Sequence, residues 1–164
     1  MKNKIRFLNH ASFLLESKNS IVIIDPWLEG YAFDNGWALV DQSTSNKETI
    51  EYISNSIKTL CIWYSHEHSD HFSVSFLKSL KEKKIHATIY YQKTIDGRVA
   101  KFIKGLGFDV VESNCVVEKI DNEISISIWP YSHGDSYLLI RFAGHSILNL
   151  NDCMVTTKAQ AEEI

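Results

Sequence analysis

The feature that most constrains this chain is a run of metal-ligand residues directly after a predicted buried strand. The apolar residues 60–64 predict the strand, and Ser65-His66-Glu67-His68-Ser69-Asp70-His71 follows it. Imidazoles together with a carboxylate favour zinc, with iron or manganese as alternatives, because calcium and magnesium prefer oxygen ligands throughout. Beyond a strand end, the first two histidines can point to one side while the aspartate and the last histidine turn to the other. The run therefore predicts a loop that serves up to two adjacent divalent metal ions.

Two later residues stand at predicted strand ends in the same way. His133 follows the alternating run of residues 124–128, and Asp152 ends the run of residues 146–151. Taken alone, His133 would be an ordinary loop histidine. Asp152 alone would be a turn former or the N-cap of a helix predicted over residues 154–164. The histidine cluster likewise has a second interpretation, as a polar surface loop or as a cap of the helix that follows it.

The spacing His-x-His-x-Asp-His resembles the motif of the metallo-β-lactamase superfamily. Its members carry this motif at the end of a buried strand, a further histidine and aspartate at later strand ends, and usually one last histidine near the C-terminus. The resemblance implies a metal-dependent hydrolase and a ligand set: the first metal would be held by His66, His68 and His133, the second by Asp70 and His71, and both would be bridged by Asp152. No histidine follows Asp152 in this sequence, so the usual last ligand of the second metal is missing from it.

A second segment narrows the resemblance. Residues 25–37, Asp-Pro-Trp-Leu-Glu-Gly-Tyr-Ala-Phe-Asp-Asn-Gly-Trp, are similar to a segment in the metallo-β-lactamase-like part of the CMP-N-acetylneuraminate monooxygenases, and similar Asp-Pro segments occur in the lactonase-like branch. Asp25 ends a predicted strand and could orient a ligand histidine. Trp27 and the other aromatic residues of this segment could line a pocket or plug a core. His10, which joins two predicted strands, could line the same cleft.

The cysteines limit the redox chemistry that this chain can support and indicate its cellular compartment. The monooxygenases of that family also carry a Rieske iron–sulfur domain, which needs paired Cys and His ligands. This chain has only Cys61, Cys115 and Cys153, with no Cys-x-His pair, so it cannot supply electrons from such a cluster. The odd cysteine count and the lack of a secretory signal favour a reducing cytoplasm.

Composition excludes several classes of partner. The formal net charge is −3, with 23% charged and 45% hydrophobic residues. The chain therefore lacks the excess of positive charge that is typical of nucleic-acid-binding proteins. No run of roughly 18 apolar residues could span a membrane. We therefore expect a small-molecule substrate. A polar metabolite, such as a phosphorylated or nucleotide-linked sugar, is implied by the family resemblance alone.

The order of predicted elements indicates an α/β fold, and the resemblance makes it a metallo-β-lactamase-like αββα sandwich over residues 1–164. Because a helical pattern runs to the last residue, we expect the N-terminal portion of a longer domain, with an apolar surface that a homodimer could cover. Strands are predicted at residues 4–8, 11–17, 20–25, 59–64, 87–91, 109–112, 115–120, 123–129, 136–142 and 145–151, and helices at 47–57 with Asn46 as N-cap, 73–83, 95–105 and 154–164.

The leading functional hypothesis is metal-dependent hydrolysis of an ester, lactone or phosphoester. Metal-activated water would attack the substrate, and Asp70 or Asp152 would orient that water and pass its proton to the leaving group. A second hypothesis is an iron-dependent oxygenase module that acts on a sugar nucleotide. A third is a metal-binding fragment without catalytic activity.

Overall fold

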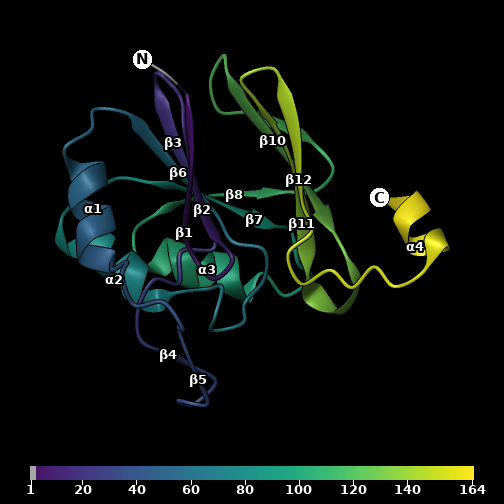
Figure 1. Ribbon diagram of the computed structural model, residues 1–164, viewed down its shortest axis with the longest axis horizontal. Coiled ribbons are helices and arrows are strands. Elements are labelled where there is room, and N and C mark those ends of the chain that lie inside the picture. The colour runs from purple at the N-terminus through teal and green to yellow at the C-terminus, as the bar shows by residue number, and fades with distance from the viewer. Residues whose placement is uncertain (1–2) are drawn as a thin grey trace.

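A computed structural model describes residues 3–164. Its larger sheet has six strands in the order β1-β2-β3-β6-β7-β8 (Figure 1). These strands are β1 (Lys4–Asn9), β2 (Ser12–Glu16), β3 (Ser20–Ile24), β6 (Thr59–Trp63), β7 (Thr88–Gln92) and β8 (Asp109–Ser113). Strand β2 is antiparallel to both of its neighbours, whereas β3, β6, β7 and β8 are parallel. The carboxyl ends of β1, β3, β6 and β7 therefore lie at one edge of the sheet.

The smaller sheet is antiparallel throughout, in the order β12-β11-β10-β9. Its strands are β9 (Val117–Lys119), β10 (Ile124–Pro130), β11 (Ser136–Phe142) and β12 (His145–Asn149). A 3₁₀ turn, η1 (Ser132–Gly134), joins β10 to β11. A separate two-stranded hairpin is formed by β4 (Tyr31–Ala32) and β5 (Trp37–Ala38).

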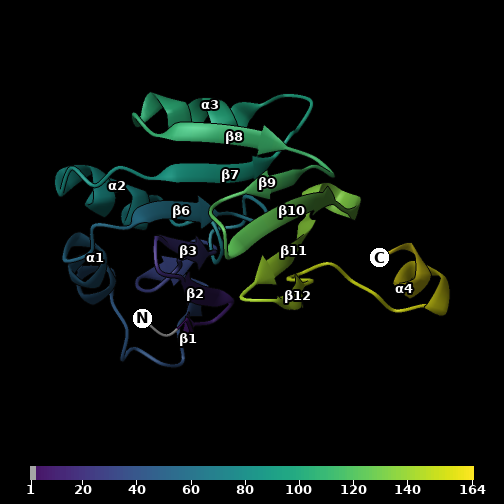
Figure 2. The ribbon, with the colours of Figure 1, turned by 90° about the horizontal axis from the view of Figure 1, so that it is seen from above.

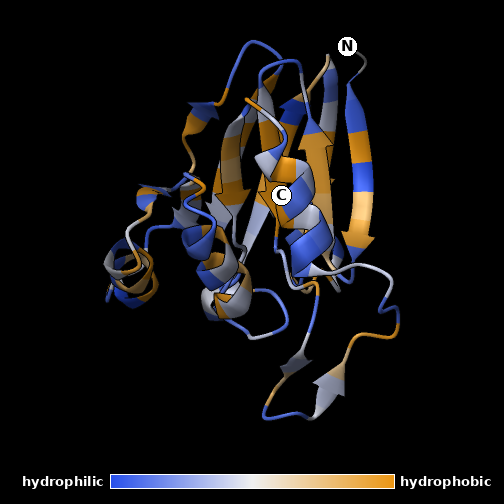
Figure 3. Ribbon diagram, turned by 90° about the vertical axis from the view of Figure 1, so that its left-hand side faces the viewer, coloured by the Kyte–Doolittle hydropathy of each residue, from blue (hydrophilic) through white to orange (hydrophobic). Residues whose placement is uncertain are grey.

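Successive layers are visible from above in Figure 2: helices, the larger sheet and then the smaller sheet. The helical layer contains α1 (Asn46–Ser54), α2 (Val74–Glu82) and α3 (Arg98–Gly105), and the apolar strands of the larger sheet lie behind it in Figure 3. A short helix, α4 (Lys158–Glu163), lies beyond the smaller sheet. The expected α/β sandwich is confirmed.

Strand β6 shows why this arrangement forms. Leu60 and Ile62 pack into the core beneath the helices, whereas Cys61 and Trp63 pack into the core between the two sheets. Alternate side chains of a strand point to opposite faces, so a strand that is apolar throughout is stable only when it is covered on both sides. The ligand-rich loop therefore starts from a strand that is buried on both faces.

Two predicted helix starts are wrong. Helix α1 is capped by Ser45, whose hydroxyl accepts a hydrogen bond from the Glu48 amide at 3.2 Å, while the Asn46 side chain donates to Glu29 instead. Helix α3 begins at Arg98 rather than at residue 95, because Thr94 accepts a hydrogen bond from the Gly97 amide and closes a turn first.

The last predicted helix is also shorter than expected. It begins at Lys158, where Thr157 and Gln160 form a capping box. Asp152 therefore does not cap it, which leaves that carboxylate free to take part in the site described below. Among the described residues, no helix is long and apolar enough to cross a membrane.

Candidate metal centre

The sequence-predicted ligands gather at the edge where β1, β3 and β6 end, together with the chain that follows β12. His66, Asp70 and His71 are buried, whereas His68 and Asp152 are exposed. Binding sites in sheets with parallel strands commonly lie at the carboxyl ends of those strands. This edge therefore combines buried side chains, which can be held rigidly, with exposed ones that a ligand can reach.

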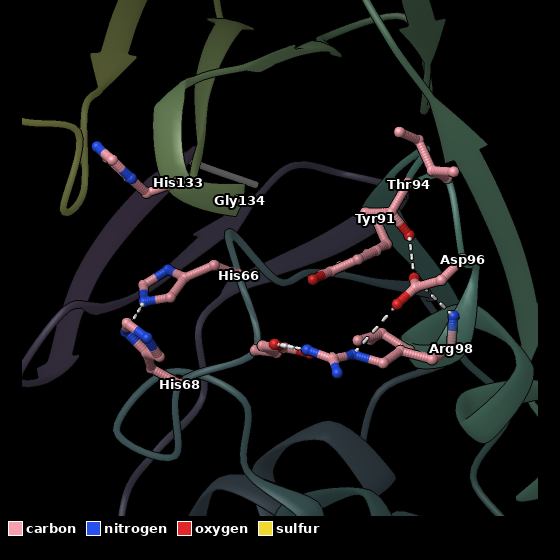
Figure 4. Close-up of a pocket in the computed structure, with 11 residues that line it drawn as sticks. His66, His68, Tyr91, Thr94, Asp96, Arg98, His133 and Gly134 are labelled. Atoms are coloured by element: carbon pink, nitrogen blue, oxygen red, sulfur yellow. Dashed lines mark hydrogen bonds and ion pairs between the residues drawn. The ribbon is translucent and has the colours of Figure 1, made fainter.

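The first group of potential ligand atoms comes from His66, His68 and Asp152. The Nε2 atom of His66 lies 3.0 Å from Nδ1 of His68 and 3.7 Å from Oδ2 of Asp152. Figure 4 shows the His66 and His68 rings next to each other beside a pocket, with their planes nearly perpendicular. The two imidazole nitrogens are at hydrogen-bond distance here, and together with the carboxylate oxygen, all within 4.8 Å of one another, they form a donor set that suits a transition-metal ion.

The second group comes from Asp70, His71 and His10. Oδ2 of Asp70 lies 3.6 Å from Nε2 of His71 and 3.4 Å from Nε2 of His10. Oδ1 of Asp152 lies 3.5 Å from the same His71 nitrogen. The two oxygens of Asp152 therefore face different groups, as a bridging carboxylate requires.

Two buried polar atoms support the fit of this arrangement to metal ions. Oδ1 of Asp70 and Nε2 of His71 are both inaccessible to solvent, and neither has a hydrogen-bond partner among the described residues. Leaving such an atom unsatisfied costs about 1–3 kcal/mol. A cation bound between Asp70 and His71 would give the His71 nitrogen a partner, and the nitrogen and oxygen donors of the group match zinc, iron or manganese.

The Asp25 carboxylate contacts His71 of the second group directly and His66 of the first group through Ser65. Its carboxylate accepts hydrogen bonds from the Ser65 amide and hydroxyl, both at 2.8 Å, and lies 3.2 Å from Nδ1 of His71. The Ser65 oxygen is in turn 2.8 Å from Nδ1 of His66. When each Nδ1 carries its proton toward these oxygens, the Nε2 atoms of His66 and His71 are free to bind metal. This is the contact expected for Asp25, and its effect on metal binding stays a prediction.

Burial and charge set the protonation of the two buried histidines. Burial lowers the pKa of His66, and the neighbouring His71 lowers it further, so the neutral form that binds metal is favoured. Burial also disfavours the charged form of His71, but the hydrogen bond to Asp25 and the surrounding carboxylates outweigh it, and the pKa of His71 is raised. Metal binding at His71 must therefore compete with a proton.

His133, the third ligand expected for the first metal, joins neither group among residues 3–164. It lies in η1 with a φ of 62°, and its ring points away from His66 and His68 in Figure 4. Gly134 is held by a hydrogen bond from the Gln92 amide to its carbonyl. His133 does line the same pocket, and its ligand role stays a prediction.

The pocket beside the first group encloses about 400 Å³. Its wall contains Arg98, which forms an ion pair with Glu67 of the ligand loop, and Tyr91. Charged residues, Glu67, Asp96 and Arg98, line part of it, and Ile95 and Val99 contribute apolar surface. Figure 4 shows these side chains on the α3 side of His66.

The aromatic residues of the segment 25–37 divide between the two roles considered for them. Trp27 is buried and packs edge-on against His10, with ring centroids 5.3 Å apart. Tyr31, Phe33 and Trp37 are exposed on the β4–β5 hairpin, and Phe33 contacts His68 at 5.9 Å between ring centroids. Trp27 therefore fills a core position, while Phe33 borders the exposed side of the ligand loop.

From the sequence, Ser65 had no predicted role and His10 had only a lesser one. Ser65 stood within the ligand run without a role, although β3 and β6 are parallel neighbours and bring it beside Asp25. His10 had only been expected to line the cleft. The signal that could have found it is strand direction: β1 runs parallel to β3 and β6, so its carboxyl end reaches the same edge.

The family model for the beta-lactamase superfamily domain matches residues 4–163. The chain belongs to this superfamily. The metallo-β-lactamase-like resemblance seen in the sequence is thereby confirmed. Curated relatives include the cytidine monophosphate-N-acetylneuraminic acid hydroxylases of Xenopus laevis and Mus musculus. Each is 29% identical over 157 residues, which cover 92% of this chain and 26% of the relative. The chain thus spans about a quarter of the length of these relatives.

Solved structures share the fold at low sequence identity. CmlA, a diiron β-hydroxylase from Streptomyces venezuelae, is 16% identical with a TM-score of 0.69, over 99% of this chain and 32% of that chain. A putative metal-dependent hydrolase from Parabacteroides distasonis is 16% identical with a TM-score of 0.55, over 92% of this chain and 60% of that one. Human tRNase Z, short form, is 14% identical with a TM-score of 0.53, over 93% and 66% of the respective chains. These similarities show the fold alone.

Proposed function

We propose that this chain carries a dinuclear metal centre that hydrolyses an ester, lactone or phosphoester of a polar metabolite, with zinc as the simplest metal. The observation that carries the proposal is the position of Asp152 between two ligand groups, with one oxygen 3.7 Å from His66 and the other 3.5 Å from His71. The unsatisfied atoms of Asp70 and His71 support it.

Two divalent ions held there would supply Lewis-acid polarisation of a substrate oxygen and a lowered pKa for water. The remaining roles belong to the side chains. Asp152 is half exposed, so it can accept a proton from an attacking water and return it to the leaving group. Asp70 is buried and is better suited to orientation than to proton transfer with the substrate.

Iron-dependent hydroxylation is the second candidate, and the names of several relatives are its support. The curated relatives named above are hydroxylases, and CmlA is a diiron β-hydroxylase with the same fold. The ligand groups suit iron as well as zinc. Such a reaction would need molecular oxygen and a source of electrons outside these 164 residues, because their three cysteines form no Rieske pair. A nucleotide-linked sugar is the substrate class that the relatives suggest.

Metal identity and turnover distinguish these candidates. The protein is purified without added metal, its metal content is measured by elemental analysis, and it is assayed with lactones, phosphodiesters and nucleotide-linked sugars. Zinc with hydrolysis supports the first candidate. Iron, with oxygen consumption on a nucleotide-linked sugar in the presence of a reductant, supports the second. Metal binding without any turnover would leave the chain as a metal-binding fragment.

Variants test whether the histidines hold the metal. His66→Ala and His68→Ala should lose metal while their circular dichroism spectra stay unchanged. His145→Ala is the matched control, because His145 is an exposed histidine on β12. A folded wild-type protein that takes up no metal, even on titration, would refute the proposal.

A further inference from the structure

Among residues 3–164, the second ligand group consists of Asp70, His71 and His10. We propose that His10, in the turn between β1 and β2, is the third protein ligand of the second metal ion, beside Asp70 and His71. This inference rests on the dinuclear centre of the proposed function. It assigns to the first hairpin of the chain a role that the ligand motif does not contain.

The side-chain atoms of His10, Asp70 and His71 are spaced as the ligands of one ion would be. Ligand atoms bound tetrahedrally at about 2.0–2.2 Å from zinc lie roughly 3.3–3.6 Å from one another. Oδ2 of Asp70 lies 3.4 Å from Nε2 of His10 and 3.6 Å from Nε2 of His71. An N–H···O hydrogen bond is usually about 2.7–3.2 Å long. Both contacts exceed that range and match the separation of two ligands that share an ion.

Two residues of this group, Asp70 and His71, are buried and incompletely hydrogen-bonded among the described residues. The Nε2 atom of His71, which faces Oδ2 of Asp70, is buried without a hydrogen-bond partner among residues 3–164, and so is the other Asp70 oxygen, Oδ1. Asp70 and His71 belong to the same group as His10. His10 itself is partly exposed, with 35% of its side chain accessible. Asp70 and His71 are therefore buried with hydrogen-bonding capacity left unused. His10 lies on the accessible side, from which an ion can arrive.

The backbone at His10 adopts a conformation that is uncommon for a residue other than glycine. His10 occupies the first central position of a two-residue hairpin turn with a φ of 42°, a region that favours glycine at such turns. A side chain held in a sparsely populated conformation often marks a functional position. At His10 an imidazole stands where glycine would suit the backbone better.

The surroundings of the turn fix the direction of the His10 ring. The buried Asn9 side chain accepts a hydrogen bond from the His10 amide at 2.9 Å, and its own amide group donates to the Asp41 carbonyl and to Thr44. Trp27 packs edge-on against the imidazole. A ligand needs this kind of preorganisation, because metal sites depend on contacts that orient the coordinating ring.

The test is titration of the metal-free protein with Zn²⁺ alone, followed by calorimetry and by elemental analysis after gel filtration. The variants are His10→Gly, which removes the imidazole and suits the turn, and His10→Gln, whose amide can still donate to Asp70. His145→Ala is the control. The wild type and the control should each bind two equivalents. Both His10 variants should bind one equivalent with near wild-type affinity and the second at least about 100-fold more weakly, since even outer contacts cost 10- to 100-fold.

Several results would overturn the assignment. If His10→Gly binds the second equivalent within about threefold of the wild-type affinity, His10 is not a ligand, while the dinuclear centre and the proposed function stand. If His10→Gln alone restores the second equivalent, His10 only supports Asp70. If the wild type binds one equivalent, the second site does not exist, and if it binds none, the proposed function fails as well.

Discussion

Substituting Asp25 by asparagine should uncouple metal binding from folding. The carboxylate of Asp25 accepts hydrogen bonds from the Ser65 amide, the Ser65 hydroxyl and the Asn151 amide, and it faces Nδ1 of His71. Asparagine keeps the shape but replaces one of the two acceptor oxygens with an NH₂ group. If the remaining oxygen stays with the Ser65 amide, the new donor points at His71.

The proton of His71 must then move. With a donor opposite its Nδ1, the imidazole is stable only with that nitrogen as an acceptor and the proton on Nε2. Nε2 is the atom that faces Asp70 and Asp152, so the lone pair needed for metal is lost. Loss of such an orienting contact typically lowers metal affinity by about 10- to 100-fold.

The cost to folding should be smaller and separable. One buried acceptor disappears, for which about 1–3 kcal/mol is typical, and each kcal/mol corresponds to roughly 2–4 °C in Tm for a chain of this size. We expect Asp25→Asn to remain folded at 25 °C in the metal-free state, measured by circular dichroism and urea denaturation. Zn²⁺ affinity is measured by calorimetry on the same sample.

Asp121→Asn is the matched control. Asp121 accepts hydrogen bonds from the Glu123 and Ile124 amides, in the turn that precedes β10 and away from the ligand groups. This variant should lose a similar free energy of unfolding while its Zn²⁺ affinity stays unchanged. Wild-type affinity in Asp25→Asn, or an equal loss of affinity in both variants, would refute the reasoning.

Three further predictions concern stability. Burial raises the pKa of Glu16, but hydrogen bonds from Lys58 and Tyr52 outweigh it and the pKa is lowered; this contribution to stability is present above the unfolded value of about 4.3 and is lost as the pH falls below it. Urea denaturation between pH 7 and pH 3 should therefore show a decline that Glu16→Gln flattens, and an unchanged slope would contradict this. Ile62→Ala, at a fully buried position, should cost about 2–5 kcal/mol; a loss below 1 kcal/mol in the same assay would mean that β6 is not packed on both faces. Adding Zn²⁺ to the chelator-treated protein at 100 times the dissociation constant should stabilise it by about 2.7 kcal/mol per site, and an unshifted Tm would contradict metal binding to the folded state.

Local sequence patterns predicted the parts of this fold that depend on local interactions. The apolar run of β6 and the ligand loop after it needed no knowledge of distant residues, because a fully apolar strand with polar residues at its end has few alternatives. The start of α3 was misjudged, because the turn that delays it depends on one hydrogen bond between Thr94 and Gly97. Periodicity carries no information about such a bond.

The composition of the ligand groups depended on features that spacing does not encode. His133 was expected beside His66, but a positive φ in the turn after β10 directs its ring elsewhere. His10 was expected only to line the cleft, and it joins Asp70 because three strands run in the same direction. Strand order and direction are properties of the whole sheet, which motif matching within one loop cannot supply.

The position of Asp152 gives the proposed metal centre a mechanical consequence. Asp152 follows the last strand of the smaller sheet, whereas His66 and His71 follow a strand of the larger one. A shared ion would act as a cross-link between positions 71 and 152, closing a loop of roughly eighty residues, and cross-links over long loops restrict the unfolded chain most. Removing the metal should therefore loosen the two sheets from each other before it disturbs either one, so that amide exchange rises first along β12.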